Sequence, residues 1–112
     1  MSATTFRLLE SHGSDRVVQL RLIGELDLAV VDQFSRRLAE LVGAGFRVRL
    51  DLSRLEFIDS TGLHALVRAV MDGHGEGGEL VSVEDAVGRQ VKAAIELVGA
   101  APTLWPESQH IL

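Results

Sequence analysis

Apolar residues along this chain switch repeatedly between two spacings. They first alternate with polar residues, as at Val18, Leu20 and Leu22, which is the spacing of a β-strand with one buried face. They then recur at intervals of three and four residues, which is the spacing of a helix with one buried stripe. Because strand and helix patterns follow one another, the sequence predicts an α/β fold with a mixed sheet packed with helices.

The predicted order of elements is strand, strand, helix, strand, helix, strand, helix, in a sheet of four to five strands. The first two strands, near residues 5–8 and 18–22, form a hairpin around turn residues 12–15. Two further strands are predicted at residues 47–52 and 80–83. The predicted helical stripes are Val31, Phe34, Leu38, Leu41 and Val42, then Leu63, Leu66, Val67 and Val70, and finally Val87, Val91, Ile95 and Val98.

Capping and turn residues predict where these elements begin and end. Asp27 is expected to cap the first helix, because its carboxylate can accept hydrogen bonds from first-turn amides. Residues 54–59 are expected to connect the third strand to the second helix, and residues 73–78 to form a flexible glycine-rich loop. The third helix is expected to start at residues 84–85, and residues 104–105 to form a short edge strand.

Length and composition narrow the class of protein. The chain has 112 residues, which fits one domain with a core at about residues 5–100 and a short tail at residues 101–112. Its formal charge of −5 argues against direct binding to nucleic acid. There is no cysteine, no leader-like segment at residues 1–10 and no apolar run of the ~20 residues that a membrane helix needs. We therefore expect a cytoplasmic protein without disulfides or a membrane segment.

The segment Phe-Ile-Asp-Ser-Thr-Gly-Leu at residues 57–63 is the strongest candidate for chemistry. Ser60 lies where the second helix must begin, and serine is a favoured N-cap residue. A phosphate on Ser60 would meet unpaired amides and add roughly −1.5 to −2 charges beside Asp59. That change would form a binary switch for a docking surface. The same serine could also serve only as a helix cap, and periodicity and composition do not decide between these two interpretations.

The sequence does not support an enzyme. Asp-Ser-Thr-Gly at residues 59–62 is similar to an aspartic protease motif, but the motif occurs once and those enzymes need two carboxylates. Ser60 is not part of a Gly-x-Ser-x-Gly motif, although His64 follows it by four residues. The four histidines have no metal-ligand spacing. We therefore expect neither catalytic residues, nor a metal, nor a cofactor.

Several segments together resemble the signature of STAS-domain anti-sigma factor antagonists. The matching segments are residues 24–27, residues 50–53 with Leu55, residues 57–63, residues 77–80 and residues 96–99. The resemblance covers roughly residues 5–100 and implies a STAS-type fold. It is most specific at residues 57–63, where two apolar residues lead into Asp-Ser-Thr-Gly.

The resemblance implies a bacterial phosphoprotein that regulates a sigma factor, and hence transcription, by partner switching in a stress response. In such families the unphosphorylated domain binds an anti-sigma factor that is also a serine kinase of the GHKL type, and this binding frees the sigma factor. The kinase phosphorylates Ser60, with Thr61 as the weaker candidate, and a PP2C-type phosphatase removes the phosphate. A monomer or weak dimer is expected.

The resemblance also assigns roles to the residues around Ser60. Asp59 helps to shape the phosphoacceptor site, and Asp27 lies near it on the surface that faces the kinase. Gly62 allows a partner backbone to approach closely. His64 departs from the family pattern, which more often has a small residue or glycine at this position near the presumed interface. It could tune partner binding or point to solvent, and we expect it to point to solvent because exposed helix positions are polar by default. Two alternatives remain open. In the first, the domain is an accessory subunit of a transporter complex and docks on an ATPase without phosphorylation. In the second, it is part of a larger stress-signalling complex.

Overall fold

The computed structural model describes residues 5–75 and 78–106 and has a four-stranded mixed sheet with the order β1-β2-β3-β6. The strands are β1 (Arg7–His12), β2 (Val17–Leu26), β3 (Arg47–Ile58) and β6 (Val81–Val83). β1 is antiparallel to β2, whereas β3 is parallel to both β2 and β6. The α/β class, the mixed sheet and the opening hairpin are therefore confirmed.

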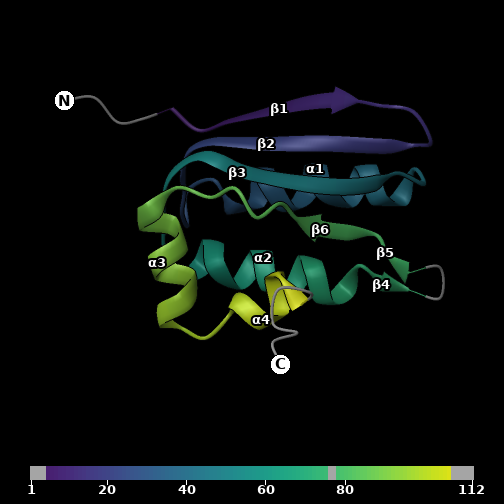
Figure 1. Ribbon diagram of the computed structural model, residues 1–112. Helices are drawn as coiled ribbons and strands as arrows, with labels where there is room; N and C mark the ends of the chain where they lie inside the picture. The colour runs from purple at the N-terminus through teal and green to yellow at the C-terminus, as the bar shows by residue number, and fades with distance from the viewer. Residues whose placement is uncertain (1–4, 76–77, 107–112) are drawn as a thin grey trace.

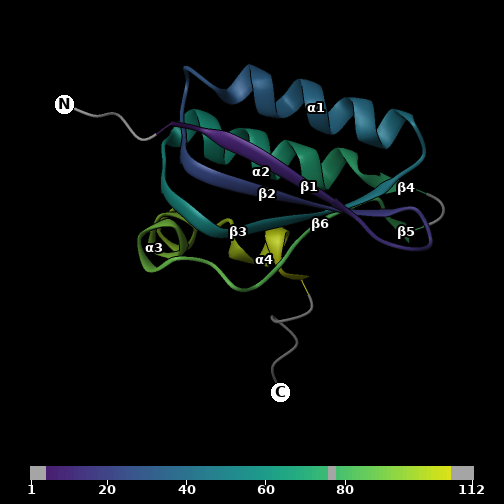
Figure 2. The same ribbon diagram turned by 90° about the horizontal axis from the view of Figure 1, so that it is seen from above.

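The helices cover one face and one side of this sheet. α1 (Val31–Gly43) and α2 (Ser60–Asp72) lie side by side on one face, as Figure 2 shows. α3 (Arg89–Leu97) and α4 (Ala101–Leu104) lie on the side of the sheet that ends with β6 (Figure 1). The remaining strands, β4 (His74–Gly75) and β5 (Gly78–Glu79), form a separate antiparallel pair after α2.

The core lies between the sheet and α1 and α2. Every second residue of β2 is buried, and at residues 18–22 the apolar side chains face the core while the polar ones between them face away from it. Each fully buried leucine or valine contributes about 1.5–3 kcal/mol through removal of apolar surface from water. The central members of the core are Val18, Leu20, Leu22, Leu26, Phe34, Leu38, Leu41, Val48, Leu50, Leu52, Leu66 and Val70.

An ion pair between Glu10 and Arg37 ties β1 to α1. Arg37 donates to the Glu10 carboxylate through Nε and Nη2, and the Nη2–Oε1 distance is 2.9 Å. The guanidinium of Arg37 lowers the pKa of Glu10 to about 2. This contact anchors α1 to the edge strand of the sheet.

β3 is longer than the sequence pattern predicted. The expected connection at residues 54–59 continues the strand instead, because Arg54 pairs with Ile23 and Ile58 pairs with Leu26. The β2–β3 register shifts twice in this region. These shifts break the strict alternation of buried and exposed residues in β3. The sequence pattern therefore did not indicate the second half of this strand.

The expected start of the third helix at residues 84–85 is also wrong. The Glu84 amide donates to the Leu50 carbonyl at 2.8 Å, which extends the pairing between β3 and β6. α3 begins five residues later, at Arg89, with Gly88 as its N-cap. Negative charge at residues 84–85 therefore does not mark a helix start in this chain.

The C-terminal part of the described chain differs from prediction in two further places. Residues 101–104 form α4, and Trp105 follows it as C-cap, so the predicted edge strand at residues 104–105 is wrong. Val98 is 61% exposed and does not belong to the buried stripe of α3. The expected loop at residues 73–78 contains strand β4 and the start of β5, while residues 76–77 lie outside the described residues.

Candidate functional site

The candidate site lies at the edge of the sheet where β2 and β3 end and where α1 and α2 begin. β3 passes directly into α2, whose first residue is Ser60. β2 instead leads into a short loop at residues 27–30 before α1 starts. Because these connections are short, the N-terminal ends of both helices meet at one edge of the molecule.

Asp59 holds the two junctions together. Its Oδ1 atom accepts a hydrogen bond from the Gly62 amide at 2.8 Å, and its Oδ2 atom accepts one from the Leu28 amide at 3.1 Å. The Asp59 amide donates to the Leu26 carbonyl at 3.2 Å. Both carboxylate oxygens are therefore used in backbone contacts, one within α2 and one to the loop after β2.

Ser60 has a different local role from the one that propensity predicted. The N-cap of α2 is Asp59, whose backbone is extended and whose side chain reaches the Gly62 amide. Ser60 is the first helical residue and is exposed. The prediction that Ser60 caps the helix is wrong, and its hydroxyl remains accessible because Asp59 performs the capping.

Asp27 lies near the start of α2, and it does not cap α1. Leu26 and Ile58 are partners in the β2–β3 register, so Asp27 lies at the same sheet edge as Asp59. Asp27 Oδ1 accepts a hydrogen bond from the Ala29 amide at 3.0 Å, within the loop. The N-cap of α1 is Val30, which makes no side-chain capping bond. The predicted cap at Asp27 is therefore wrong.

Gly62 is buried and packs against its own chain. A Cβ atom at this position would lie 2.5 Å from the Leu26 carbonyl oxygen and 2.8 Å from Leu26 Cγ. The close approach that this glycine permits is between α2 and β2. The expected role of Gly62, the close approach of a partner backbone, therefore does not fit its position.

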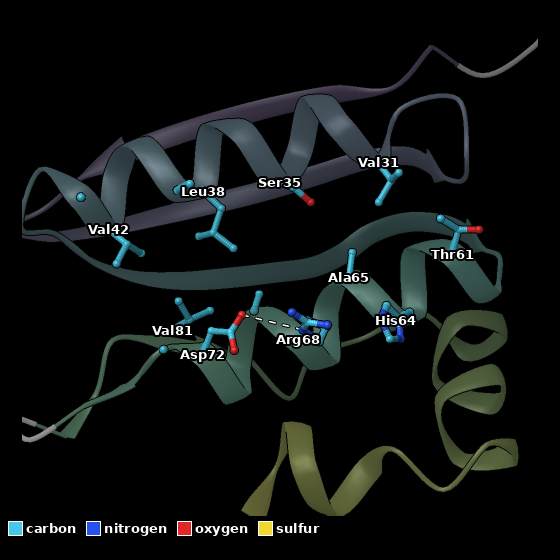
Figure 3. Close-up of a pocket in the computed structure, with 14 residues that line it drawn as sticks. Val31, Ser35, Leu38, Val42, Thr61, His64, Ala65, Arg68, Asp72 and Val81 are labelled. Carbon is cyan, nitrogen blue, oxygen red and sulfur yellow. Dashed lines mark ion pairs between the residues drawn. The ribbon is translucent and has the colours of Figure 1, made fainter.

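Thr61 and His64 line a groove between α1 and α2 with a volume of about 610 Å³. Figure 3 shows these two residues at the same end of the groove as Val31. Thr61 is half-buried, whereas His64 is exposed, the orientation expected for it. The groove walls are mainly aliphatic, and the Arg68–Asp72 ion pair lies along its rim at 3.8 Å.

Leu28 is a surface feature of this edge that sequence reasoning missed. Its side chain is 71% exposed in the loop between Asp27 and α1. The available signal was a large apolar residue directly after the Gly-Glu-Leu-Asp segment, outside any periodic stripe. An exposed leucine beside an exposed serine gives this edge both an apolar and a polar contact point.

Within residues 5–75 and 78–106, no group of three or more His, Cys, Asp or Glu side chains could hold a metal ion. No helix in the described part of the chain is long and apolar enough to cross a membrane.

Comparison with protein families gives one match that covers most of the chain. A family model described as "Mlab, STAS domain" matches residues 10–104. Among curated proteins, no sequence matches the chain significantly.

Comparison with solved structures finds the same fold in several proteins. An anti-sigma factor antagonist from Mycobacterium paratuberculosis aligns with a TM-score of 0.71 and 23% identity, over 89% of this chain and 83% of that one. The Bacillus cell fate determinant SpoIIAA in its phosphorylated form aligns with a TM-score of 0.64 and 21% identity, over 88% and 86%. The STAS domain of an antisigma-factor antagonist from Rhodobacter sphaeroides shares 26% identity, with a TM-score of 0.54, over 74% and 96%.

Proposed function

The chain belongs to the STAS domain family, and from this premise we propose that it is an anti-sigma factor antagonist switched by phosphorylation of Ser60. In this proposal the unphosphorylated form binds an anti-sigma factor serine kinase of the GHKL type and thereby frees a sigma factor. Phosphorylation ends that binding, and a PP2C-type phosphatase restores it. The observation that carries the proposal is the exposed hydroxyl of Ser60 at the first residue of α2, beside a cap supplied by Asp59.

The position of Ser60 suits a charge-based switch. The N-terminal turn of a helix has amides without helical partners and a partial positive charge, so a phosphate is tolerated there. A phosphate also adds roughly −1.5 to −2 charges and strong acceptor atoms. Because Asp59 already directs its carboxylate oxygens to the Gly62 and Leu28 amides, the fold does not depend on the Ser60 hydroxyl.

The surroundings of Ser60 explain how added charge would end binding. Leu28 is exposed at the same edge, and Thr61 and His64 begin the apolar groove next to it. A partner that covers these groups would remove them from water. A phosphate in the same interface would lose its hydration, which disfavours the complex unless cations meet it. One structural neighbour, SpoIIAA, is described in both an unphosphorylated and a phosphorylated form, which supports this proposal.

Phosphate transfer can be tested directly with purified proteins. The chain is incubated with ATP and a candidate GHKL-type serine kinase, and intact mass with peptide mapping locates any phosphate. We expect one phosphate on Ser60 in the native chain and in Thr61→Ala, the matched control, and none in Ser60→Ala. A phosphate that persists in Ser60→Ala would show that the assigned site is wrong.

A second candidate function is the alternative expected from the sequence resemblance. It is an accessory subunit that docks on the ATPase of a transporter complex without a phosphate switch. The description of the matching family model names the STAS domain and no partner, so it fits this function as well as the first. Ser60→Asp separates the two functions. In the first, the added charge weakens binding to the kinase. In the second, assembly with the ATPase is unchanged if Ser60 lies outside the contact between the domain and the ATPase.

A further inference from the structure

The sheet has a second face that no helix covers within the described residues. α1 and α2 both lie on the face that carries the core, while α3 and α4 lie at the β6 side (Figures 1 and 2). The uncovered face displays the alternate residues of each strand, which are intermediate or exposed along most of β1, β2 and β3. Phe57 and Leu9, both large apolar residues, are 48% and 41% exposed there.

Strand register places arginines and apolar residues side by side on this face. Arg7 lies opposite Ile23, and Ile23 lies opposite Arg54, so one row crosses three strands. Because neighbouring strands are about 4.8 Å apart, the backbones of the two arginines are about 10 Å apart across Ile23. We call this surface the open face and define it by six residues. They are Arg7, Leu9, Arg21, Ile23, Arg54 and Phe57.

Two carboxylates on this side of the sheet already have partners. Asp51 Oδ2 accepts a hydrogen bond from Arg21 Nε at 2.8 Å, and Asp51 Oδ1 accepts one from the Ser53 amide at 2.9 Å. Burial raises the pKa of Asp51, but the hydrogen bonds from Ser53 and Arg21 outweigh it and hold the pKa below its ordinary value. Glu84 Oε2 likewise accepts from Gln19 Nε2 at 2.8 Å.

By contrast, neither of the two outer arginines of the row, Arg7 and Arg54, makes an ion pair within residues 5–75 and 78–106, and both are exposed. The chain as a whole has a net charge of −5. These two guanidinium groups therefore give the uncovered face a local positive charge that is opposite in sign to the net charge of the chain. Arginine and aromatic residues are enriched in protein interfaces, and arginine can bind carboxylates through two parallel hydrogen bonds.

We propose that the open face is a second docking surface, which binds an acidic, partly apolar segment of another protein. Carboxylates of that segment pair with Arg7 and Arg54, and its apolar side chains cover Ile23 and Phe57. A protein fits better than a membrane or a nucleic acid, because Glu25 lies opposite Phe57 in the β2–β3 register. A uniformly negative surface would meet Glu25 as a like charge, whereas a protein segment can place its carboxylates at Arg7 and Arg54 and an apolar side chain at Phe57.

Docking at the open face is separate from the proposed switch. Ser60 begins α2, which lies on the opposite face of the sheet from Arg7 and Arg54. The domain could therefore hold an acidic partner while its other face is free, bound or phosphorylated. This inference does not depend on phosphorylation, and Ser60→Asp is expected to leave it unchanged.

The test is an NMR titration of the labelled 112-residue chain with a synthetic peptide of alternating Glu and Leu residues at low salt. We expect shifts for open-face residues and not for the groove between α1 and α2. Arg7→Glu with Arg54→Glu should weaken binding about tenfold or more, because two charge-assisted contacts become repulsive. Arg36→Glu with Lys92→Glu makes the same charge change on exposed residues of α1 and α3 and should bind nearly as well as the native chain.

Three outcomes would overturn the proposal. The first is an equal loss of binding in both double variants, which would show attraction to net charge alone. The second is a set of shifts confined to α1 and α2. The third is tighter binding, through the same arginines, to phosphatidylglycerol vesicles or to a single-stranded oligonucleotide than to the peptide. Circular dichroism of both double variants confirms that each is folded before titration.

Discussion

The two helices that border the candidate site begin in different ways, although both follow a strand that ends with an aspartate. α2 starts at the end of β3, and the Asp59 carboxylate bonds both to its first turn and to the neighbouring loop. α1 starts after a loop, and the Asp27 carboxylate bonds only to the Ala29 amide inside that loop. Asp59 therefore joins α2 to the loop after β2, whereas Asp27 makes its contact only within that loop.

This difference also explains why Ser60 is available. A helix start needs an acceptor for its first amides, and at α2 that acceptor belongs to the preceding residue. The serine next to it is therefore not required for the helix. A hydroxyl that folding does not use can be modified without unfolding the domain.

Replacing Asp59 with Ala should have the largest effect on stability. The variant loses the helix cap, at about 0.5–2 kcal/mol, together with the bond to the Leu28 amide, so we expect about 2 kcal/mol less free energy of unfolding. Urea denaturation followed by circular dichroism measures this. Asp59→Asn, which keeps one acceptor oxygen, should recover part of the loss. A loss in Asp59→Ala no larger than that of Asp27→Ala would remove the distinction between the two aspartates.

Gly62→Ala should destabilise the domain by a smaller amount, about 1–2 kcal/mol. The added methyl group would meet the Leu26 carbonyl oxygen at 2.5 Å, and overpacking of this kind costs about 1–3 kcal/mol. Because the closest contact is with a backbone atom, which cannot easily move aside, we expect a cost in the upper half of this range. The better helix propensity of alanine offsets about 1 kcal/mol of it. Thermal unfolding compares the variant with Gly43→Ala, where a Cβ would meet no atom within 4 Å. Equal melting temperatures for the two variants would show that α2 does not need this close approach.

Asp27→Ala should cost less still, about 0.5–1 kcal/mol, because one exposed hydrogen bond to the Ala29 amide is lost. Under the proposed function, the variant should weaken the kinase complex by more than this change in stability accounts for. Calorimetric binding and urea denaturation of the same variant separate the two effects. A loss of binding that only matches the loss of stability would limit Asp27 to its role in the loop.

Ser60→Ala should have the smallest effect, within about 0.5 kcal/mol of the native chain, since exposed substitutions away from caps change stability little. Thr61→Ala, at the half-buried neighbour, is the matched control. Differential scanning calorimetry is precise enough for this comparison. A destabilisation near that of Asp59→Ala would mean that Ser60 takes part in the cap, which would contradict the observed division of roles.

Much of the architecture could be predicted because it depends on local spacing. The alternation at residues 18–22 and the helical stripe through Phe34, Leu38 and Leu41 identify their elements without knowledge of any neighbour. The position of Ser60 at the start of the second helix was also predicted. The register shifts beyond Arg21 were not, because a bulge alters which residues face the core without leaving a regular pattern in the sequence.

By itself, the sequence determined the order of the four strands of the main sheet and of α1, α2 and α3, the one buried face of the sheet and the segment that contains the candidate serine. Only the tertiary structure decided that Asp59 caps α2, that Gly62 packs on Leu26 and that Arg7 and Arg54 share one row. The physical reason is distance along the chain. Periodicity records which way neighbouring side chains point, whereas capping, close packing and charge pairing depend on atoms that folding brings from remote segments.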